Sequence, residues 1–416
     1  MIIEGHFIDA KQDHGICQVE IKGNKIVKVL KEAAQRADFK FYEEILIPGI
    51  VDIHTHLRYG EPHKEDIESG TKAAINGGVV RIMDMPNNPK GFAPVDSESY
   101  KRKLEWLAQG HIPVHLYAGI GPDTKPFPEA KYYKVFMAES VGDLFFNDLD
   151  TLDSVLENYR GCNVAFHCED PQVIKSCLDK PVHEERRSPL AEVTSVKNAL
   201  YLIQKHNLHG MLMHISCKDS VELIKASETK ALVEVTPHHL ILDSKRVENL
   251  PYGKLSKMNP PLRSEDDAAY MRSLLHSEFI HHIGSDHAPH TLEEKLGKED
   301  ALRNPKGVTN PSGIPGLDTM GQTAAYLHCS YNVSLTKLNQ LLSYNPSKYL
   351  GIKHGLLKPG YEASFAALDF EFCCSLDSDS IYTKAGWNAY KGIVMPTIPF
   401  VMAQGRIVKE DGELKV

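Results

Sequence analysis

Short apolar runs alternate with longer amphipathic segments over residues 49–357, a pattern typical of repeated strand–helix units. Helices are expected between the runs: one ends at Gly77, and Asp96 can cap another that ends at Gly110. The eight strand candidates are residues 49–54, 80–85, 113–118, 132–137, 163–167, 210–214, 231–235 and 279–284. Eight parallel strands in about 300 residues predict an α/β fold of the (β/α)8 TIM-barrel type. The alternative, a doubly wound open sheet, lacks a Gly-x-Gly-x-x-Gly turn after its first strand.

Both ends of the chain carry the alternation of hairpin strands. Near the start, residues 18–21 and 26–29 flank the turn Lys22-Gly23-Asn24-Lys25. Near the end, residues 363–368, 400–403 and 406–409 repeat the pattern. Because a half-sheet alone is too small to be stable, we expect the two ends to meet in one small β-sandwich. The predicted division is residues 1–48 and 358–416 for the sandwich and 49–357 for the barrel.

Composition and charge narrow the function classes. The 416 residues are 42% hydrophobic and 25% charged, which excludes long disorder as the main feature. The net charge of −8 and the lack of a Lys/Arg-rich run argue against a nucleic-acid partner. The first ten residues lack a signal-peptide pattern, and no apolar run approaches membrane-span length, so a cytoplasmic location without a membrane partner is expected. The 8 Cys residues include no CxxC pair and are expected to be reduced thiols.

Histidines gather where the predicted strands end. The functional residues of a barrel lie at the carboxyl ends of its strands, where the βα loops surround one mouth. Any one of these histidines is most simply a hydrogen-bonded core residue. Several imidazoles and a carboxylate at one mouth would be poorly buried without a cation to share. The residues concerned are His54, His56, His167, His214 and Asp286, and the fourth strand adds Lys134.

Several motifs together resemble the cyclic amidohydrolases of the amidohydrolase superfamily, and among these the dihydroorotase family most closely. The resemblance covers nearly the whole chain. The motifs that suggest the superfamily are His54-Thr55-His56, Lys134, residues 166–170, His214-Ile215-Ser216 and residues 284–290. Those similar to the substrate-contact motifs of the family are Leu57-Arg58, Met85-Pro86-Asn87-Asn88-Pro89 and Met258-Asn259-Pro260-Pro261-Leu262-Arg263.

This resemblance implies two divalent metal ions, with Zn²⁺ the first choice and Mn²⁺, Co²⁺ or Fe²⁺ as alternatives. It implies one ion held by His54, His56 and Asp286, a second held by His167 and His214, and an N6-carboxylated Lys134 bridging them. Asp286 would also carry the catalytic proton. Arg58, Asn87, Asn259 and His290 would bind the substrate, whereas His238 and His239 are given no ligand role.

The implied reaction is the reversible hydrolysis of (S)-dihydroorotate to N-carbamoyl-L-aspartate in pyrimidine biosynthesis, and a homodimer is expected from the family alone. One departure concerns the loop after the second histidine, where the family has Leu-Arg-Glu-Pro-Gly and this chain continues Arg58-Tyr59-Gly60-Glu61-Pro62. The alternatives are a hydantoinase/dihydropyrimidinase or an allantoinase, which share the metal set, and a non-catalytic scaffold. A metal-free isomerase would leave the histidine cluster unexplained.

Overall fold

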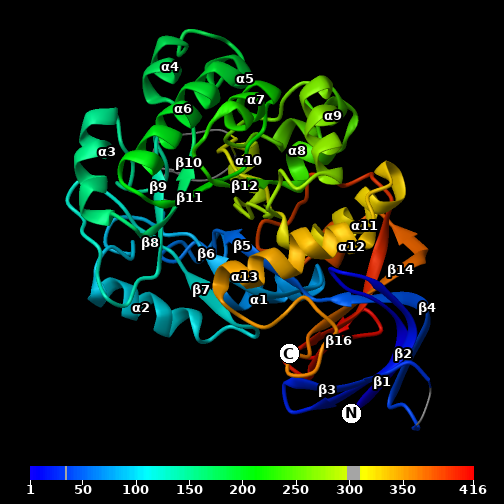
Figure 1. The fold of residues 1–416 in the computed structure, drawn as a ribbon. Coiled ribbons are helices and arrows are strands. Elements are labelled where there is room, and N and C mark those ends of the chain that lie inside the picture. The colour runs from blue at the N-terminus through cyan, green and yellow to red at the C-terminus, as the bar shows by residue number, and fades with distance from the viewer. Residues whose placement is uncertain (33–34, 298–309) are drawn as a thin grey trace.

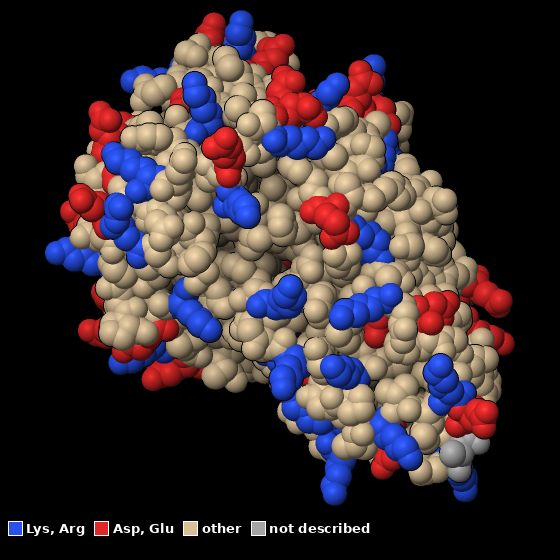
Figure 2. Space-filling model, in the orientation of Figure 1, with Lys and Arg blue, Asp and Glu red and all other residues tan. Residues whose placement is uncertain are grey.

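The computed structural model describes residues 1–32, 35–297 and 310–416 of the chain. A barrel surrounded by helices occupies one side of the molecule, and a sheet that includes both termini lies beside it (Figure 1). On the face shown in Figure 2, acidic and basic side chains are interspersed. Among the described residues, no helix combines the length and the apolar character needed to cross a membrane.

The terminal sheet joins strands from the two ends of the chain in the order β17-β16-β15-β14-β4-β1-β2-β3. Its centre is the antiparallel pair of β14 and β4, in which Phe365 lies opposite Pro48. Phe7 packs edge-on against Phe365 with ring centroids 5.4 Å apart. The strands are β1 (Ile2–Ile8), β2 (Asp13–Lys22), β3 (Lys25–Leu30), β4 (Phe39–Pro48), β14 (Phe365–Cys374), β15 (Met395–Ala403), β16 (Arg406–Glu410) and β17 (Glu413–Leu414). The prediction that both ends share one β-structure is confirmed.

The barrel strands coincide with the predicted apolar runs. They are β5 (Ile50–Thr55), β6 (Val79–Asp84), β7 (Val114–Leu116), β8 (Ala118–Gly119), β9 (Tyr132–Phe136), β10 (Asn163–His167), β11 (His209–Leu212), β12 (Leu232–Val235) and β13 (His282–Ile283). The third predicted strand is split at Tyr117, so that β7 pairs with β6 and β8 pairs with β9. The barrel closes through a parallel bridge between Thr55 and His287, beside which the His56 N–H donates to the His287 carbonyl at 2.8 Å. The TIM-barrel prediction is confirmed.

Helices cover the outside of the barrel (Figure 1). The Asp96 carboxylate caps α2 by accepting from the Ser99 N–H, as predicted, but the helix ends at Leu107, three residues before Gly110. The helices are α1 (Ile67–Asn76), α2 (Ser97–Leu107), α3 (Leu149–Leu156), α4 (Pro171–Ser176), α5 (His183–Arg186), α6 (Pro189–Lys205), α7 (Lys218–Ala226), α8 (Pro237–Ile241), α9 (Glu265–Ser273), α10 (Leu292–Leu296), α11 (Met320–Tyr331), α12 (Leu335–Asn339) and α13 (Asn345–Leu350). This shell leaves the mouth of the barrel open at the strand ends.

Candidate active site

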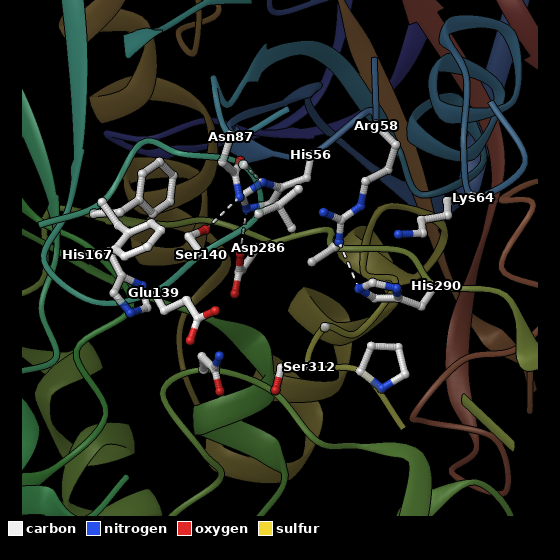
Figure 3. A pocket seen from close by; sticks show the side chains of 18 of the residues that line it. His56, Arg58, Lys64, Asn87, Glu139, Ser140, His167, Asp286, His290 and Ser312 are labelled. Atoms are coloured by element: carbon white, nitrogen blue, oxygen red, sulfur yellow. Dashed lines mark hydrogen bonds and ion pairs between the residues drawn. The ribbon is translucent and has the colours of Figure 1, made fainter. Parts of the chain in front are cut away.

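A cavity of about 790 Å³ lies at the carboxyl ends of the barrel strands. Its walls bring together all ten candidate site residues, which come from segments as far apart as residues 54 and 290. They are His54, His56, Arg58, Asn87, Lys134, His167, His214, Asn259, Asp286 and His290. Figure 3 labels His56, Arg58, Asn87, His167, Asp286 and His290 among them. The barrel topology is what makes these distant residues neighbours.

The first ligand group is His54, His56 and Asp286, all buried, with ligand atoms within 4.8 Å of one another. Asp286 Oδ1 lies 3.1 Å from His54 Nε2 and 3.2 Å from His56 Nε2. Burial raises the pKa of the Asp286 carboxyl, but the two imidazoles outweigh it and hold the pKa well below its ordinary range. The group is therefore an anionic carboxylate facing two imidazole nitrogens.

The second group is His167 and His214, whose Nδ1 and Nε2 atoms lie 2.9 Å apart. The opposite nitrogen of His167, Nε2, donates to Glu169 Oε2 at 2.9 Å, so its Nδ1 carries a lone pair that faces His214. Burial lowers the pKa of both histidines and keeps them neutral. Arg187, which also lines the cavity, binds the same Glu169.

Lys134 is fully buried on β9 and lines the same cavity as the two groups of histidines. Its Nζ lies 2.9 Å from Met213 Sδ, and the structure records no carboxylate ion pair for it among the described residues. Burial lowers the pKa of Lys134 to about 8, although Glu234 and Asp286 oppose the shift. Near pH 8 about half of these amines are therefore neutral and nucleophilic, in contrast to an ordinary lysine.

Glu234, on β12, is a buried carboxylate that the sequence argument missed. Its Oε1 accepts from His54 Nδ1 at 2.6 Å and from the backbone N–H of His214 at 3.1 Å. Its Oε2 accepts from His282 Nε2 at 2.7 Å. Glu234 therefore binds His54 through Nδ1, which leaves Nε2 to face Asp286, and it connects the two histidine groups.

Asn87, which the family resemblance assigns to substrate binding, lines the cavity, and its amide also holds neighbouring side chains. Its Oδ1 accepts from His56 Nδ1 at 2.7 Å, and its Nδ2 donates to Ser140 Oγ at 3.1 Å. The bond to Nδ1 leaves the lone pair of His56 on Nε2, which faces Asp286. Asn87 thus orients His56 from a position on the cavity wall (Figure 3).

Arg58 and His290 line the cavity on the side away from His167 (Figure 3). Arg58 donates from Nε to the Pro289 carbonyl at 3.1 Å and from Nη2 to His290 Nε2 at 3.3 Å. Burial and the nearby cations Arg58, Lys64 and Lys295 keep the pKa of His290 well below its ordinary range. In the part of the chain that the structure describes, no carboxylate forms an ion pair with Arg58, so a buried guanidinium faces the cavity without an anionic partner.

In the loop that departs from the family pattern, Arg58 and Glu61 line the cavity, whereas Tyr59 is not part of its lining. The ring of Tyr59 packs against Phe92 and Trp106, with centroids 5.2 and 4.8 Å away. Gly60 has φ +92°, and a Cβ there would meet the Phe92 ring at 2.7 Å, so this turn requires glycine. Glu61 pairs with Lys64 at 2.5 Å. The different loop therefore leaves the Arg58 side chain on the cavity wall.

Asn259, from the loop before α9, lines the cavity, and its buried Oδ1 has no hydrogen-bond partner among the described residues. A buried amide oxygen without a partner costs about 1–3 kcal/mol, so this atom is suited to a donor on a bound molecule. His238 and His239 lie outside this wall. His239 bonds Thr236 and the Pro260 carbonyl, and His238 bonds Tyr390, so neither is required as a ligand.

Three site residues have left-handed backbone conformations. The φ values are +57° for Arg58, +41° for His214 and +47° for Asp286. A non-glycine residue in this region costs of order 1–3 kcal/mol and persists only where its surroundings enforce it. The bonds of His214 to Glu234 and of Arg58 to Pro289 are part of that enforcement. Strain is therefore concentrated at the strand ends that aim side chains into the cavity.

The donor set fits divalent metal ions. Burial lowers the pKa of His54, but Glu234 and Asp286 outweigh it and raise the pKa to about 9, so a proton lies between Nε2 and the Asp286 carboxylate. A divalent cation can take the place of that proton. Neutral imidazoles with carboxylates are the ligands of zinc and related transition metals. His54, His56 and Asp286 can hold one ion, and His167 and His214 can hold another.

Comparisons with known proteins agree with this geometry. Residues 45–409 match the model of the Amidohydrolase family, which is generally metal-dependent. The chain is 32% identical to a dihydroorotase from Pyrococcus abyssi, over 95% of this chain and 88% of the relative. It is 30% identical to a dihydroorotase from Pyrococcus furiosus, over 100% and 94% of the two chains.

Solved structures show the same fold. The L-hydantoinase (dihydropyrimidinase) from Arthrobacter aurescens superposes with a TM-score of 0.88 at 22% identity, over 100% of this chain and 97% of that one. The dihydropyrimidinase from Brevibacillus agri gives 0.85 at 21% identity, over 100% and 96%. At this identity the likeness concerns architecture alone. The full-length similarity to the archaeal relatives is closer, and it identifies this chain as a member of the dihydroorotase family of amidohydrolases.

Proposed function

We propose that this protein catalyses the reversible hydrolysis of dihydroorotate to N-carbamoyl-L-aspartate, a step of pyrimidine synthesis. The observation that carries the proposal is a buried Arg58 without a carboxylate partner, on the wall opposite the paired histidine groups. A cyclic amide that bears a carboxylate needs both features, because its ring carbonyl must reach the ligand groups while its charge is neutralised. Neutral ring amides would leave Arg58 buried and unpaired.

We further propose two ions, Zn²⁺ in first place, bridged by a carboxylated Lys134. When bound, such ions lower the pKa of water and polarise the carbonyl under attack. The support on the side of the protein is the burial of Lys134, which lowers its pKa to about 8, and its place in the wall of the cavity that both histidine groups line. The neutral amine can add to CO2, and the carbamate would give the second group the anionic ligand that His167 and His214 lack.

Asp286 is placed to move the proton. Its carboxylate accepts a proton from the water that adds to the ring carbonyl carbon, and it returns the proton to the ring nitrogen as the C–N bond breaks. Proton transfer by a positioned group contributes about 10²- to 10⁴-fold. Arg58 and His290 bind the substrate carboxylate, and Asn259 Oδ1 accepts from a ring N–H. The products are a carboxylate and a ureido NH2, so the atoms balance.

A substrate panel tests the proposal. The purified protein is stripped with a chelator and then reloaded with zinc and bicarbonate. Its kcat/KM is measured on dihydroorotate, dihydrouracil, hydantoin and allantoin. We expect dihydroorotate to be preferred by at least about 100-fold, since only this ring places a carboxylate against Arg58. Faster turnover of hydantoin or dihydrouracil would assign the protein to the hydantoinase alternative instead.

A further inference from the structure

Between β14 and β15 the chain leaves the terminal sheet and crosses the barrel. Thr383 donates from its backbone N–H to Asp318 at 3.1 Å and contacts Glu65 through its hydroxyl. The Ala385 carbonyl accepts from the backbone N–H of Leu292, at the start of α10, at 2.9 Å. Residues 383–390 thus contact the barrel loops, although the sequence division placed them in the sandwich. We call residues 383–390 the crossing segment.

Trp387 is the centre of the crossing segment and is fully buried. Its Nε1–H donates to the backbone carbonyl of His290 at 2.9 Å. The side chain of His290 lines the cavity and bonds Arg58 (Figure 3). The indole therefore supports the wall formed by Arg58 and His290 from outside the cavity, through the main chain of His290.

Lys295 extends this contact to two more cavity loops. Its Nζ lies 5.2 Å from the centroid of the Trp387 ring and donates to the carbonyls of Lys257 at 3.2 Å and Pro311 at 2.6 Å. Lys257 is two residues before Asn259. Burial and the nearby cations keep the pKa of Lys295 well below its ordinary range, as expected for an amine whose acceptors are carbonyls and a ring.

The loops so joined are in direct contact with one another. The backbone N–H of Gly313 donates to the Lys257 carbonyl at 2.9 Å. A Cβ at Gly313 would lie 3.1 Å from Cδ2 of His290, so this loop packs closely against the imidazole. Asn259, His290 and Gly313 line the cavity, yet none of them is part of a barrel strand. Their positions depend on the bonds behind them.

We propose that Trp387 is a positioning residue for substrate binding, which holds His290 directly and the loop of Asn259 through Lys295. The identity of the ligand rests on the proposed function, but the mechanical role does not. A displacement of about 1 Å at a binding group can cost up to about 100-fold in rate or affinity. Because Trp387 contacts neither ligand group, its loss should change substrate affinity and leave the metal centre intact.

The first test is Trp387→Phe, which removes the N–H donor and keeps most of the ring. We expect KM for dihydroorotate to rise about 5- to 20-fold, with kcat within about 2-fold and the metal content unchanged. The control is Trp106→Phe, the same change at the only other tryptophan of the chain, on α2. Its KM and kcat should stay within about 2-fold. An unchanged KM in Trp387→Phe, or a joint loss of kcat and metal, would overturn the proposal.

A second readout is independent of turnover. Hydrogen–deuterium exchange is measured on the metal-loaded proteins, and Trp387→Phe should speed exchange in peptides covering residues 287–296 but not in those covering β9 and β10. Equal exchange there would refute the mechanical role even if dihydroorotate proves to be the wrong substrate. If Trp387→Phe fails to fold, Lys295→Met replaces it and should raise KM by displacing the loop of Asn259. An unchanged KM in Lys295→Met, or a joint loss of kcat and metal, would again overturn the proposal.

Discussion

The two halves of the cavity are built in different ways. The half proposed to hold metal, here called the metal half, consists of His54, His56, Lys134, His167, His214 and Asp286, which lie on barrel strands or within three residues of their ends. The half proposed to bind the substrate carboxylate, here called the carboxylate half, consists of Arg58, Asn259 and His290, which lie on loops. In the metal half a single buried carboxylate, Glu234, bonds residues from three strands or strand ends. In the carboxylate half the support comes from a crossing segment about 100 residues later in the chain than His290.

This difference indicates a division of labour. Strand ends are fixed by the backbone ladder, which holds the side chains of the metal half in place. Left-handed conformations occur in both halves, at His214 and Asp286 in one and at Arg58 in the other. Loops depend on side-chain contacts from outside, so a change in the carboxylate half should leave the other half in place. Changes in the metal half should therefore lower kcat or metal content, and changes in the carboxylate half should raise KM.

The largest expected effect is that of Asp286→Asn. The amide keeps an oxygen ligand but cannot carry the proton, so kcat should fall about 10³- to 10⁴-fold while bound metal is retained. Steady-state kinetics with elemental analysis of the same sample measures both. A variant that turns over at the wild-type rate would show that the proton moves by another route.

Lys134→Ala should have the next largest effect. We expect a loss of about 10³-fold in kcat/KM, because the variant lacks the proposed bridging ligand. Metal per chain should drop from two ions to one or fewer. Added short-chain carboxylates provide a control, since they can enter the space left by the side chain and restore part of the activity. Two tightly bound ions in Lys134→Ala would contradict the bridging role.

Glu234→Gln removes the acceptor that fixes His54 and should weaken metal affinity about 10- to 100-fold. Competition with a chromogenic chelator measures the affinity without reference to turnover. Glu192→Gln is the matched control, since Glu192 is also fully buried and bonds Ser216 and Arg263 rather than a ligand histidine. An equal loss in both variants would point to general destabilisation.

Arg58→Lys tests whether a change in the carboxylate half affects substrate binding and spares metal binding. Lysine keeps the charge but loses the planar fork that binds a carboxylate through two bonds, so KM for dihydroorotate should rise about 10-fold with little change in metal content. Isothermal titration with an inert carboxylate-bearing ring measures the loss directly. A fall in metal content of the size seen for Glu234→Gln would mean that the two halves are not separable.

The smallest expected effect is a pH dependence of stability. The folded protein keeps His290 neutral, whereas the unfolded chain protonates it below about pH 6.5, so the unfolded state binds more protons and acid destabilises the fold. Relative to His290→Gln, wild-type unfolding free energy should fall by up to about 1.4 kcal/mol per pH unit between pH 6.5 and 5.5. Urea titrations across that range provide the measurement, and parallel curves would contradict it.

Much of the metal half could be predicted from sequence because each ligand directly follows an apolar run. A histidine after a predicted strand is placed at the mouth by the barrel topology alone. Glu234 could not be predicted in this way, because it does not follow an apolar run. It stands inside an apolar strand between Val233 and Val235, where one charged residue fits an ordinary alternating strand. The available signal was that barrel strands are covered on both faces, so an acidic residue inside one needs a buried partner.

The carboxylate half was only partly predictable. Family motifs pointed to Arg58, Asn259 and His290, but nothing in the local pattern linked Trp387 to them. The motif that assigns Asn87 to the substrate gave no sign of its bonds to His56 and Ser140. Contacts between residues about 100 positions apart on irregular loops leave no periodicity in a sequence, so only the folded chain shows them.

The pairing of β4 with β14 and the contact of Trp387 with His290 have a consequence for biosynthesis. During translation the first four strands leave the ribosome before the barrel, yet they must wait for residues 365–374 before their sheet can be completed. The loops of Asn259 and His290 in turn wait for residue 387. A nascent chain halted before that point would hold its histidines but lack the contact that supports these loops.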